Sequence, residues 1–279
     1  MDATTWLGLQ PTHNPMRWVL PITDGISTEG QFLFGGCALG AAIGALEATT
    51  ERPLVWATAQ YLSYARPGEI MDLDVTVAVA GRGSSQARVV GHVRDREIFT
   101  VNAALGRRDL EHSGQFVERP DVPGPEDCPR RQHRWALDGY ISSRIDLRLA
   151  SARSVDELPG EPMPGGRSAL WARIPEVLDM SAATLGILGD YVPFGIGQAL
   201  GARAGGNSLD NTLRIGRLVP TEWVLLDVRI HAVQNGFGHG DVHLWAEDGT
   251  LLATASQSTI VRYWREDPPP TAPAAAPAP

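Results

Sequence analysis

The sequence contains no lysine, so each of its 24 basic side chains is an arginine. This absence excludes Schiff-base chemistry, attachment of pyridoxal phosphate and the phosphate-binding lysine of P-loop proteins. Cysteine is almost absent as well. Cys37 and Cys128 stand far apart, and two thiols make neither a disulfide framework nor a cysteine-based zinc site. We therefore expect a reducing compartment and no bound metal.

Long hydrophobic runs are also missing. No stretch reaches the ~18 apolar residues of a membrane span, and residues 1–16 lack the basic and hydrophobic regions of a signal peptide. A net charge of −8 argues against nucleic acid as a partner. Because 43% of the residues are hydrophobic and 20% are charged, the composition is typical of a globular protein. We expect a cytoplasmic protein that does not insert into membranes.

The chain divides into two structured blocks. Residues 118–134 are rich in proline and charge, which predicts a linker between an N-terminal domain (1–117) and a C-terminal domain (135–265). Residues 266–279 consist mostly of proline and alanine, which predicts a disordered tail.

Each block has the pattern of one helix followed by four strands. Residues 34–49 are small, apolar and rich in glycine, which predicts a helix packed closely against another surface. In the second block we expect a helix over the first half of 180–201, disturbed at Pro193. The strand candidates have β-rich compositions and are separated by turn residues. They cover 54–65, 70–81, 86–95 and 97–106 in the first block, and 207–216, 223–233, 240–248 and 251–264 in the second, with earlier candidates in 140–151 and 168–175.

The two blocks match each other when one is shifted by 153 residues. Matching residues fall mainly at turns and at alternate strand positions, as in the pairs Gly83–Gly236 and Asp95–Asp248. We interpret this match as a duplicated domain. If both copies share a core, positions at which one copy turns polar are candidates for chemistry. Three such positions stand out: Asp190 corresponds to Cys37, Ser208 to Val55, and Gln257 to Ala104.

These three polar residues predict a general base with a bound water. A carboxylate in an apolar cleft gains basicity, and a nearby hydroxyl and amide could hold a water against it. Asp190 could instead attack a carbonyl directly and form an anhydride. Simpler roles stay open: Asp190 as a helix cap, Ser208 as an ordinary strand-start residue, and Gln257 as a solvent-facing side chain. Asp210 shares a strand face with Ser208 by alternation, where it could orient the site or pair with Arg214.

Other motifs do not indicate a site. His231, His239 and His243 do not match a common zinc spacing and are expected on the faces of a hairpin. The NGFGHG segment, 235–240, lies between two strand candidates and is expected to form a bulged turn rather than a phosphate loop. The chain has no G-x-S-x-G motif, which argues against a Ser-His-Asp hydrolase.

At these residues the chain resembles the TesB-type (thioesterase II-like) double-hotdog acyl-CoA thioesterases. The motifs are QFLFGGCALGAAIGAL at 31–46, QYLSYARPGE at 60–69, LGDYVPFG at 188–195, NSLDNTLRI at 207–215 and DGTLLATASQSTIVR at 248–262. The resemblance covers roughly residues 15–265, and the order and spacing of its motifs are more specific than any one motif.

The resemblance implies an α+β fold, a tandem double hotdog in which two antiparallel sheets each wrap around a central helix. It implies hydrolysis of acyl-CoA, with Asp190, Ser208 and Gln257 as catalytic residues and no cofactor besides the CoA of the substrate. The matching motifs place Gly35, Gly36, Tyr61 and Asp210 at the substrate. The sequence departs from the family pattern in three places: Ser208 stands for the usual threonine, Asn211 for a histidine, and Tyr61 for a histidine of some members.

Two other function classes stay open. One is a non-catalytic protein that binds acyl ligands. The other is a hotdog enoyl-CoA hydratase, which would need a histidine beside its catalytic acid, and the chain has no histidine between His133 and His231. Because exposed hotdog sheet edges can pair with another copy, a homo-oligomer is also possible.

Overall fold

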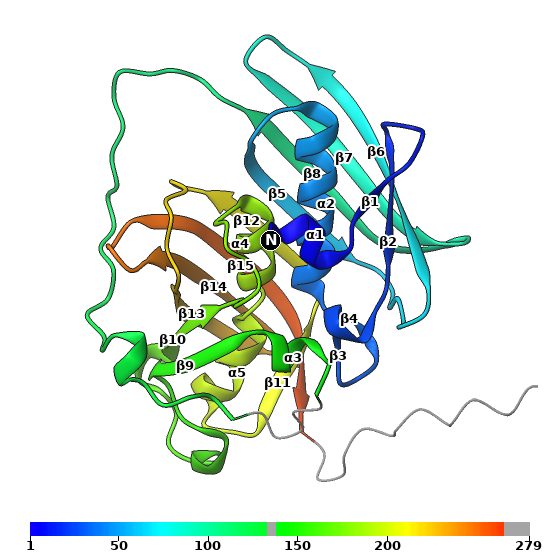
Figure 1. Ribbon diagram of the computed structural model, residues 1–279. Helices are drawn as coiled ribbons and strands as arrows, with labels where there is room; N and C mark the ends of the chain where they lie inside the picture. The colour runs from blue at the N-terminus through cyan, green and yellow to red at the C-terminus, as the bar shows by residue number, and fades with distance from the viewer. Residues whose placement is uncertain (133–137, 265–279) are drawn as a thin grey trace, which may run out of the picture.

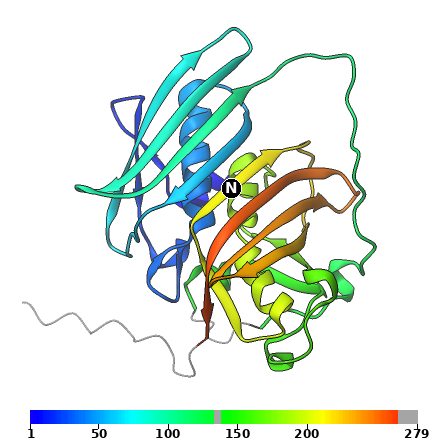
Figure 2. The same ribbon diagram turned by 180° about the vertical axis from the view of Figure 1, so that it is seen from behind.

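The computed structural model describes residues 1–132 and 138–264. Its main feature is one 13-stranded antiparallel sheet that is made by both halves of the chain. The halves join where β5 and β12 run side by side, near the middle of the sheet (Figures 1 and 2). The predicted tail, 266–279, and the end of the predicted linker, 133–134, lie outside the described residues. The domain boundaries themselves stay a prediction.

The first half places one long helix against four curved strands (Figure 1). Alternate residues of β7 are buried, as expected when one sheet face packs on a helix. The predicted helix and its four following strands are confirmed. The elements are α1 (Ala3–Leu7), β1 (Gln10–Pro11), β2 (Arg17–Pro21), β3 (Ser27–Thr28), β4 (Phe32–Leu33), α2 (Gly35–Thr50), β5 (Leu54–Tyr61), β6 (Ile70–Ala80), β7 (Ser84–Val93) and β8 (Arg96–Gly106), with a 3-10 turn at Asp24–Ile26.

The second half repeats this plan with a divided helix. The elements are α3 (Ile141–Arg144), β9 (Asp146–Ser151), β10 (Arg167–Arg173), α4 (Ala182–Leu188), α5 (Val192–Leu200), β11 (Ala204–Ser208), β12 (Asp210–Ile215), β13 (Val224–Gln234), β14 (Phe237–Ala246) and β15 (Leu251–Tyr263), with 3-10 turns at Pro125–Asp127, Val155–Glu157 and Pro164–Gly166. The 140–151 strand candidate is partly wrong, because its first residues form α3.

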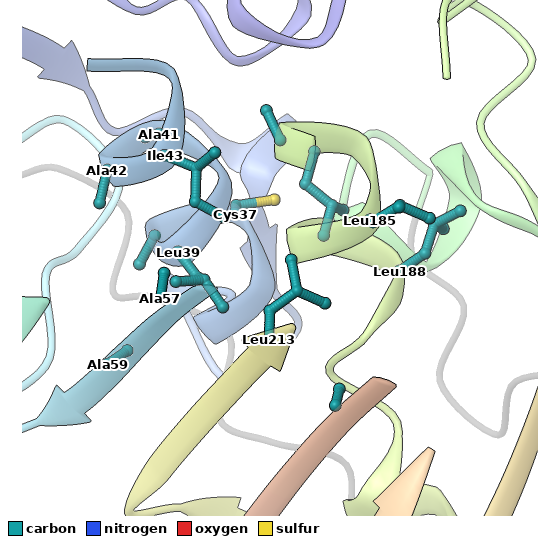
Figure 3. Packing of buried hydrophobic residues seen from close by; sticks show 14 of the residues in the cluster. Cys37, Leu39, Ala41, Ala42, Ile43, Ala57, Ala59, Leu185, Leu188 and Leu213 are labelled. Atoms are coloured by element: carbon teal, nitrogen blue, oxygen red, sulfur yellow. The ribbon is translucent and has the colours of Figure 1, made fainter. Parts of the chain in front are cut away.

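The main core lies between the helices and the inner face of the sheet. Helix α5 packs on β13, β14 and β15, whereas α4 packs on α2. Figure 3 shows Cys37 of α2 with its sulfur directed toward α4, where Leu185 and Leu188 lie. Both cysteines are buried and unpaired.

The glycines of α2 have the role that the sequence suggested. A Cβ atom on Gly36 would lie 2.5 Å from the carbonyl oxygen of Ile187, and one on Gly40 would lie 2.9 Å from that of Ala183. Only residues without a side chain permit so close an approach of α2 to α4. The prediction of close helix packing is therefore confirmed.

A smaller core lies around three tryptophans, Trp171, Trp223 and Trp245. The segment after β8 runs along the outside of the molecule (Figure 1). The indole nitrogen of Trp171 donates a hydrogen bond to the carbonyl oxygen of Pro123, and Cys128 is buried in the same cluster. Part of the predicted linker therefore packs on the second half. None of the helices within residues 1–132 and 138–264 is long and apolar enough to cross a membrane.

Candidate active site

Asp190 lies in the break between α4 and α5. The predicted helix over the first half of 180–201 is confirmed as α4, but the predicted position of the interruption, at Pro193, is wrong: the first helix stops at Leu188 and a new helix starts at Val192. Pro193 is the second residue of α5, where its missing N–H costs nothing because the first helical N–H groups have no intrahelical partner. The carboxylate is therefore displayed at a helix start and is not enclosed in a helix interior.

Three elements bring donors to this carboxylate. The backbone N–H of Gly36, at the start of α2, donates to Asp190 Oδ2 at 2.7 Å. The hydroxyl of Ser208, at the end of β11, donates to Oδ1 at 3.2 Å. The side-chain amide of Gln257, on β15, also donates to Oδ1. Asp190, Ser208 and Gln257, which the repeat comparison selected, therefore form one cluster.

Gln257 has a fixed orientation in this cluster. Its Oε1 accepts a hydrogen bond of 3.1 Å from the backbone N–H of Val192, so its Nε2 must face the other way. That nitrogen also donates to the Ser208 hydroxyl at 3.0 Å. Gln257 is only 3% exposed, which excludes the solvent-facing alternative. The Gln257 side chain thus links the N-terminus of α5 to the Asp190 carboxylate and the Ser208 hydroxyl.

The environment makes Asp190 more basic than an ordinary aspartate. The residue is 6% exposed, and this burial raises the pKa of its carboxyl because the charged form loses hydration. Hydrogen bonds from Gln257, Gly36 and Ser208 act in the opposite direction and moderate the rise in pKa. The result is a buried carboxylate that keeps strong hydrogen-bond donors but has gained affinity for a proton.

A cavity of about 150 Å³ opens beside the cluster. Gly35, Asp190 and Ser208 lie in its wall, together with the ring of Tyr61. The Tyr61 hydroxyl donates a hydrogen bond of 2.9 Å to the Gly35 carbonyl oxygen and so holds the turn that starts α2. The rest of the lining was not predicted from the sequence. It is largely apolar and comes from the residues before α2, the residues after β5, the start of α5 and β11: Thr28, Phe32, Leu33, Phe34, Ser63, Tyr64, Pro193, Gly206 and Asn207.

Asp210 does not join this site. Ser208 pairs with Thr259, whereas Thr212 pairs with Ser256, so the three residues 209–211 lie opposite the two residues 257–258. This extra residue is a β-bulge, and it breaks the alternation that placed Asp210 on the same face as Ser208. The carboxylate of Asp210 instead accepts a hydrogen bond of 2.8 Å from the Ser258 backbone N–H. No ion pair joins it to Arg214 in the described part of the chain.

The register of the strands also corrects the repeat. Thr58 pairs with Asn102 in the first half and Thr212 pairs with Ser256 in the second, so these equivalent strand pairs differ by 154 residues rather than 153. The pair Leu54–Leu105 corresponds by the same shift to Ser208–Thr259. The counterparts of Ser208 and Gln257 are therefore Leu54 and Ala103, not Val55 and Ala104. The asymmetry survives, because Leu54 and Ala103 are also buried and apolar.

The histidines lie away from the cluster. His231 contacts Asp241 at 2.9 Å and His239 contacts Ser258 at 3.1 Å, both on the hairpin of β13 and β14 and its neighbour β15. Residues 235 and 236 form the turn of this hairpin, as predicted for the glycine-rich segment. The described residues contain no group of three histidine, cysteine, aspartate or glutamate side chains arranged to hold a metal ion.

Comparisons with known proteins place this geometry in a family. Residues 122–261 match the family model described as the acyl-CoA thioesterase C-terminal domain. A Novosphingobium aromaticivorans protein described as a thioesterase is 33% identical, with a TM-score of 0.80, and the match covers 90% of this chain and 97% of that protein. No curated protein sequence matches the chain.

More distant structures show the same fold. A hotdog-fold protein from Alicyclobacillus acidocaldarius is 17% identical, with a TM-score of 0.79, and covers 91% of this chain and 96% of its own. Acyl-CoA thioesterase II TesB2 from Mycobacterium marinum is 20% identical, with a TM-score of 0.73, and covers 94% of this chain and 98% of its own. The protein is thus a double-hotdog enzyme of the thioesterase class. It belongs to the acyl-CoA thioesterase family, as the sequence motifs indicated.

Proposed function

We propose that the protein hydrolyses fatty acyl-CoA to the free acid and CoA by attack of a water that Asp190 activates. The observation that carries this proposal is the hydrogen-bonded cluster of Asp190, Ser208 and Gln257, of which Asp190 and Ser208 line one cavity. The apolar part of the wall suits an acyl chain, whose burial is worth about 0.8 kcal/mol for each CH₂ group. The attacking group is water, so the reaction needs no cofactor.

The hydrogen-bonding capacity of the cluster supports a bound water. The Ser208 oxygen donates to Asp190 and accepts from Gln257, which leaves one lone pair free. A water that donates one hydrogen to the Asp190 carboxylate and the other to Ser208 would point a lone pair at the thioester carbonyl carbon. As the water attacks, its proton passes to Asp190, and the thiolate leaves without needing a strong acid.

The surroundings of Asp190 favour the water route over an anhydride. Both carboxylate oxygens already accept hydrogen bonds from Gly36, Ser208 and Gln257. Three of its roughly four lone-pair sites are therefore engaged, and the hydrogen bonds hold the carboxylate in place, which opposes a direct attack on the carbonyl carbon. The remaining site, on Oδ2, can accept the hydrogen of a water. The start of α2, where Gly35 borders the cavity, offers the positive end of a 16-residue helix to the negative charge that develops on the carbonyl oxygen.

A thiol-release assay with acetyl-, hexanoyl-, palmitoyl- and crotonyl-CoA tests the proposed function. We expect release of CoA thiol with one of the longer saturated substrates preferred over acetyl-CoA, because a longer chain buries more apolar surface. Hydration of crotonyl-CoA without release of thiol would indicate a hydratase. Binding of all four thioesters without any turnover would indicate a ligand-binding protein, and either result would contradict the proposal.

A further inference from the structure

A second cavity, which we call the basic cavity, lies beside the active site. Its wall includes two arginines, Arg131 and Arg153, and two aromatic residues, Phe194 and Trp264. Gln198 also lines it and fixes the segment that carries Arg153, because its side-chain amide bonds both the N–H and the C=O of that residue, at 2.7 and 3.1 Å. The cavity volume, about 170 Å³, is similar to that of the active-site cavity.

The two guanidinium groups have no carboxylate partner in the part of the chain that the structure describes. Neither Arg131 nor Arg153 takes part in any ion pair there. The guanidinium of Arg131 lies over the ring of Phe194 at 4.8 Å, and its burial lowers the pKa of Arg131. The Nε of Arg153 is buried and has no hydrogen-bond partner among the same residues. A desolvated cation such as Arg131 is costly unless an anion offsets it, and the charge of Glu29 counters this effect of burial only in part.

The two cavities have one strand and one proline in common in their walls. Strand β11 starts at the basic cavity with Ala204 and Gly205 and ends at the active site with Ser208. Pro193 lies in the wall of both cavities. At about 3.3 Å for each residue, Gly205 and Ser208 are roughly 10 Å apart along the strand. One extended ligand could therefore occupy both cavities.

We propose that the basic cavity binds the phosphorylated adenosine end of the CoA thioester. This inference rests on the proposed function, because it assigns the part of the substrate that lies away from the reacting carbonyl. Guanidinium groups suit phosphate oxygens, with which they form charge-assisted and often paired hydrogen bonds. The indole of Trp264 offers an aromatic surface for the adenine ring, since the ring of Phe194 is already covered by Arg131.

Two substrates that differ only in the nucleotide separate this role from catalysis. Hexanoyl-CoA carries the phosphates and adenine, whereas hexanoyl-pantetheine does not. We define the nucleotide preference as kcat/KM for the first divided by kcat/KM for the second. We expect Arg131→Gln and Arg153→Gln each to lower this preference roughly tenfold, because each variant loses a charge-assisted hydrogen bond to phosphate. Arg82→Gln, at an exposed turn between β6 and β7, is the matched control and keeps the preference of the unaltered protein.

Direct binding keeps the proposal testable if turnover is absent. Calorimetric titration with adenosine 3′,5′-bisphosphate should show binding that is at least tenfold weaker in the double variant Arg131→Gln/Arg153→Gln than in the unaltered protein. If no thiol is released from either thioester, the proposed function fails, and this titration alone decides the role of the basic cavity. The assignment would be overturned if both single variants were folded and kept the nucleotide preference of the unaltered protein. It would also be overturned if the bisphosphate bound the double variant as tightly as the unaltered protein. Inorganic phosphate that binds as tightly as the nucleotide would also overturn it.

Discussion

Asp190→Asn is expected to lower kcat for acyl-CoA hydrolysis by about 10²–10⁴-fold, the range typical of a lost general base. The amide keeps the shape of the carboxylate but cannot accept a proton from water. It also places an NH₂ group where a carboxylate oxygen accepts from Gly36, or from Ser208 and Gln257. Thiol release at saturating substrate measures the effect.

The stability of this variant serves as the control. Removing a buried charge relieves a desolvation cost, whereas the misplaced NH₂ group loses a hydrogen bond, so the two effects oppose each other. We expect a change in the free energy of unfolding of no more than about 1 kcal/mol. A folded Asp190→Asn protein with nearly normal turnover would show that Asp190 is not the base.

Gly36→Ala is expected to damage both the fold and the site. The added Cβ would lie 2.5 Å from the Ile187 carbonyl oxygen and 3.1 Å from the Asp190 Cβ, so α2 and α4 must separate. Overpacking of this kind lowers the free energy of unfolding by about 1–3 kcal/mol. Moving the Gly36 N–H away from Asp190 should also lower kcat/KM, on the order of 10²-fold for a displacement near 1 Å.

Gly124→Ala is the matched control for this prediction. Gly124 has a φ of −64°, which alanine adopts freely. The atom nearest to an added Cβ, Oδ2 of Asp127, would lie 3.9 Å from it. Chemical denaturation of both variants, with thiol release measured in parallel, compares them. Equal stability and equal turnover of the two variants would contradict the packing argument.

The duplicated sequence contained enough information to predict that Asp190, Ser208 and Gln257 lie together. Asp190 and Gln257 are polar where the first copy has small apolar residues, and this difference does not depend on the details of packing. The one-residue error in the strand register did no harm, because the residues on both sides of each counterpart are apolar or small. The glycines of α2 were also informative, since a helix tolerates them only for a local reason.

The geometry of the break and the bulge could not be predicted. Pro193 indicates a helix interruption, but proline is compatible with either the end of one helix or the first turn of the next. The bulge between Ser208 and Thr212 adds one residue to a strand, and alternation gives no sign of such an insertion. The basic cavity joins Arg131, Arg153 and Trp264 from separate regions of the chain, and their meeting depends on tertiary packing.

The pH dependence of kcat/KM tests the central claim most directly, namely that Asp190 acts as a buried base. Burial raises the pKa of Asp190, and only the deprotonated carboxylate accepts a proton. Activity should therefore fall as the pH drops through this raised pKa and level off above it. We predict an inflection above pH ~3.9, the usual value for aspartate, and its loss in the residual activity of Asp190→Asn. A plateau that persists below pH ~4 in folded protein, or an inflection that Asp190→Asn retains, would contradict the account.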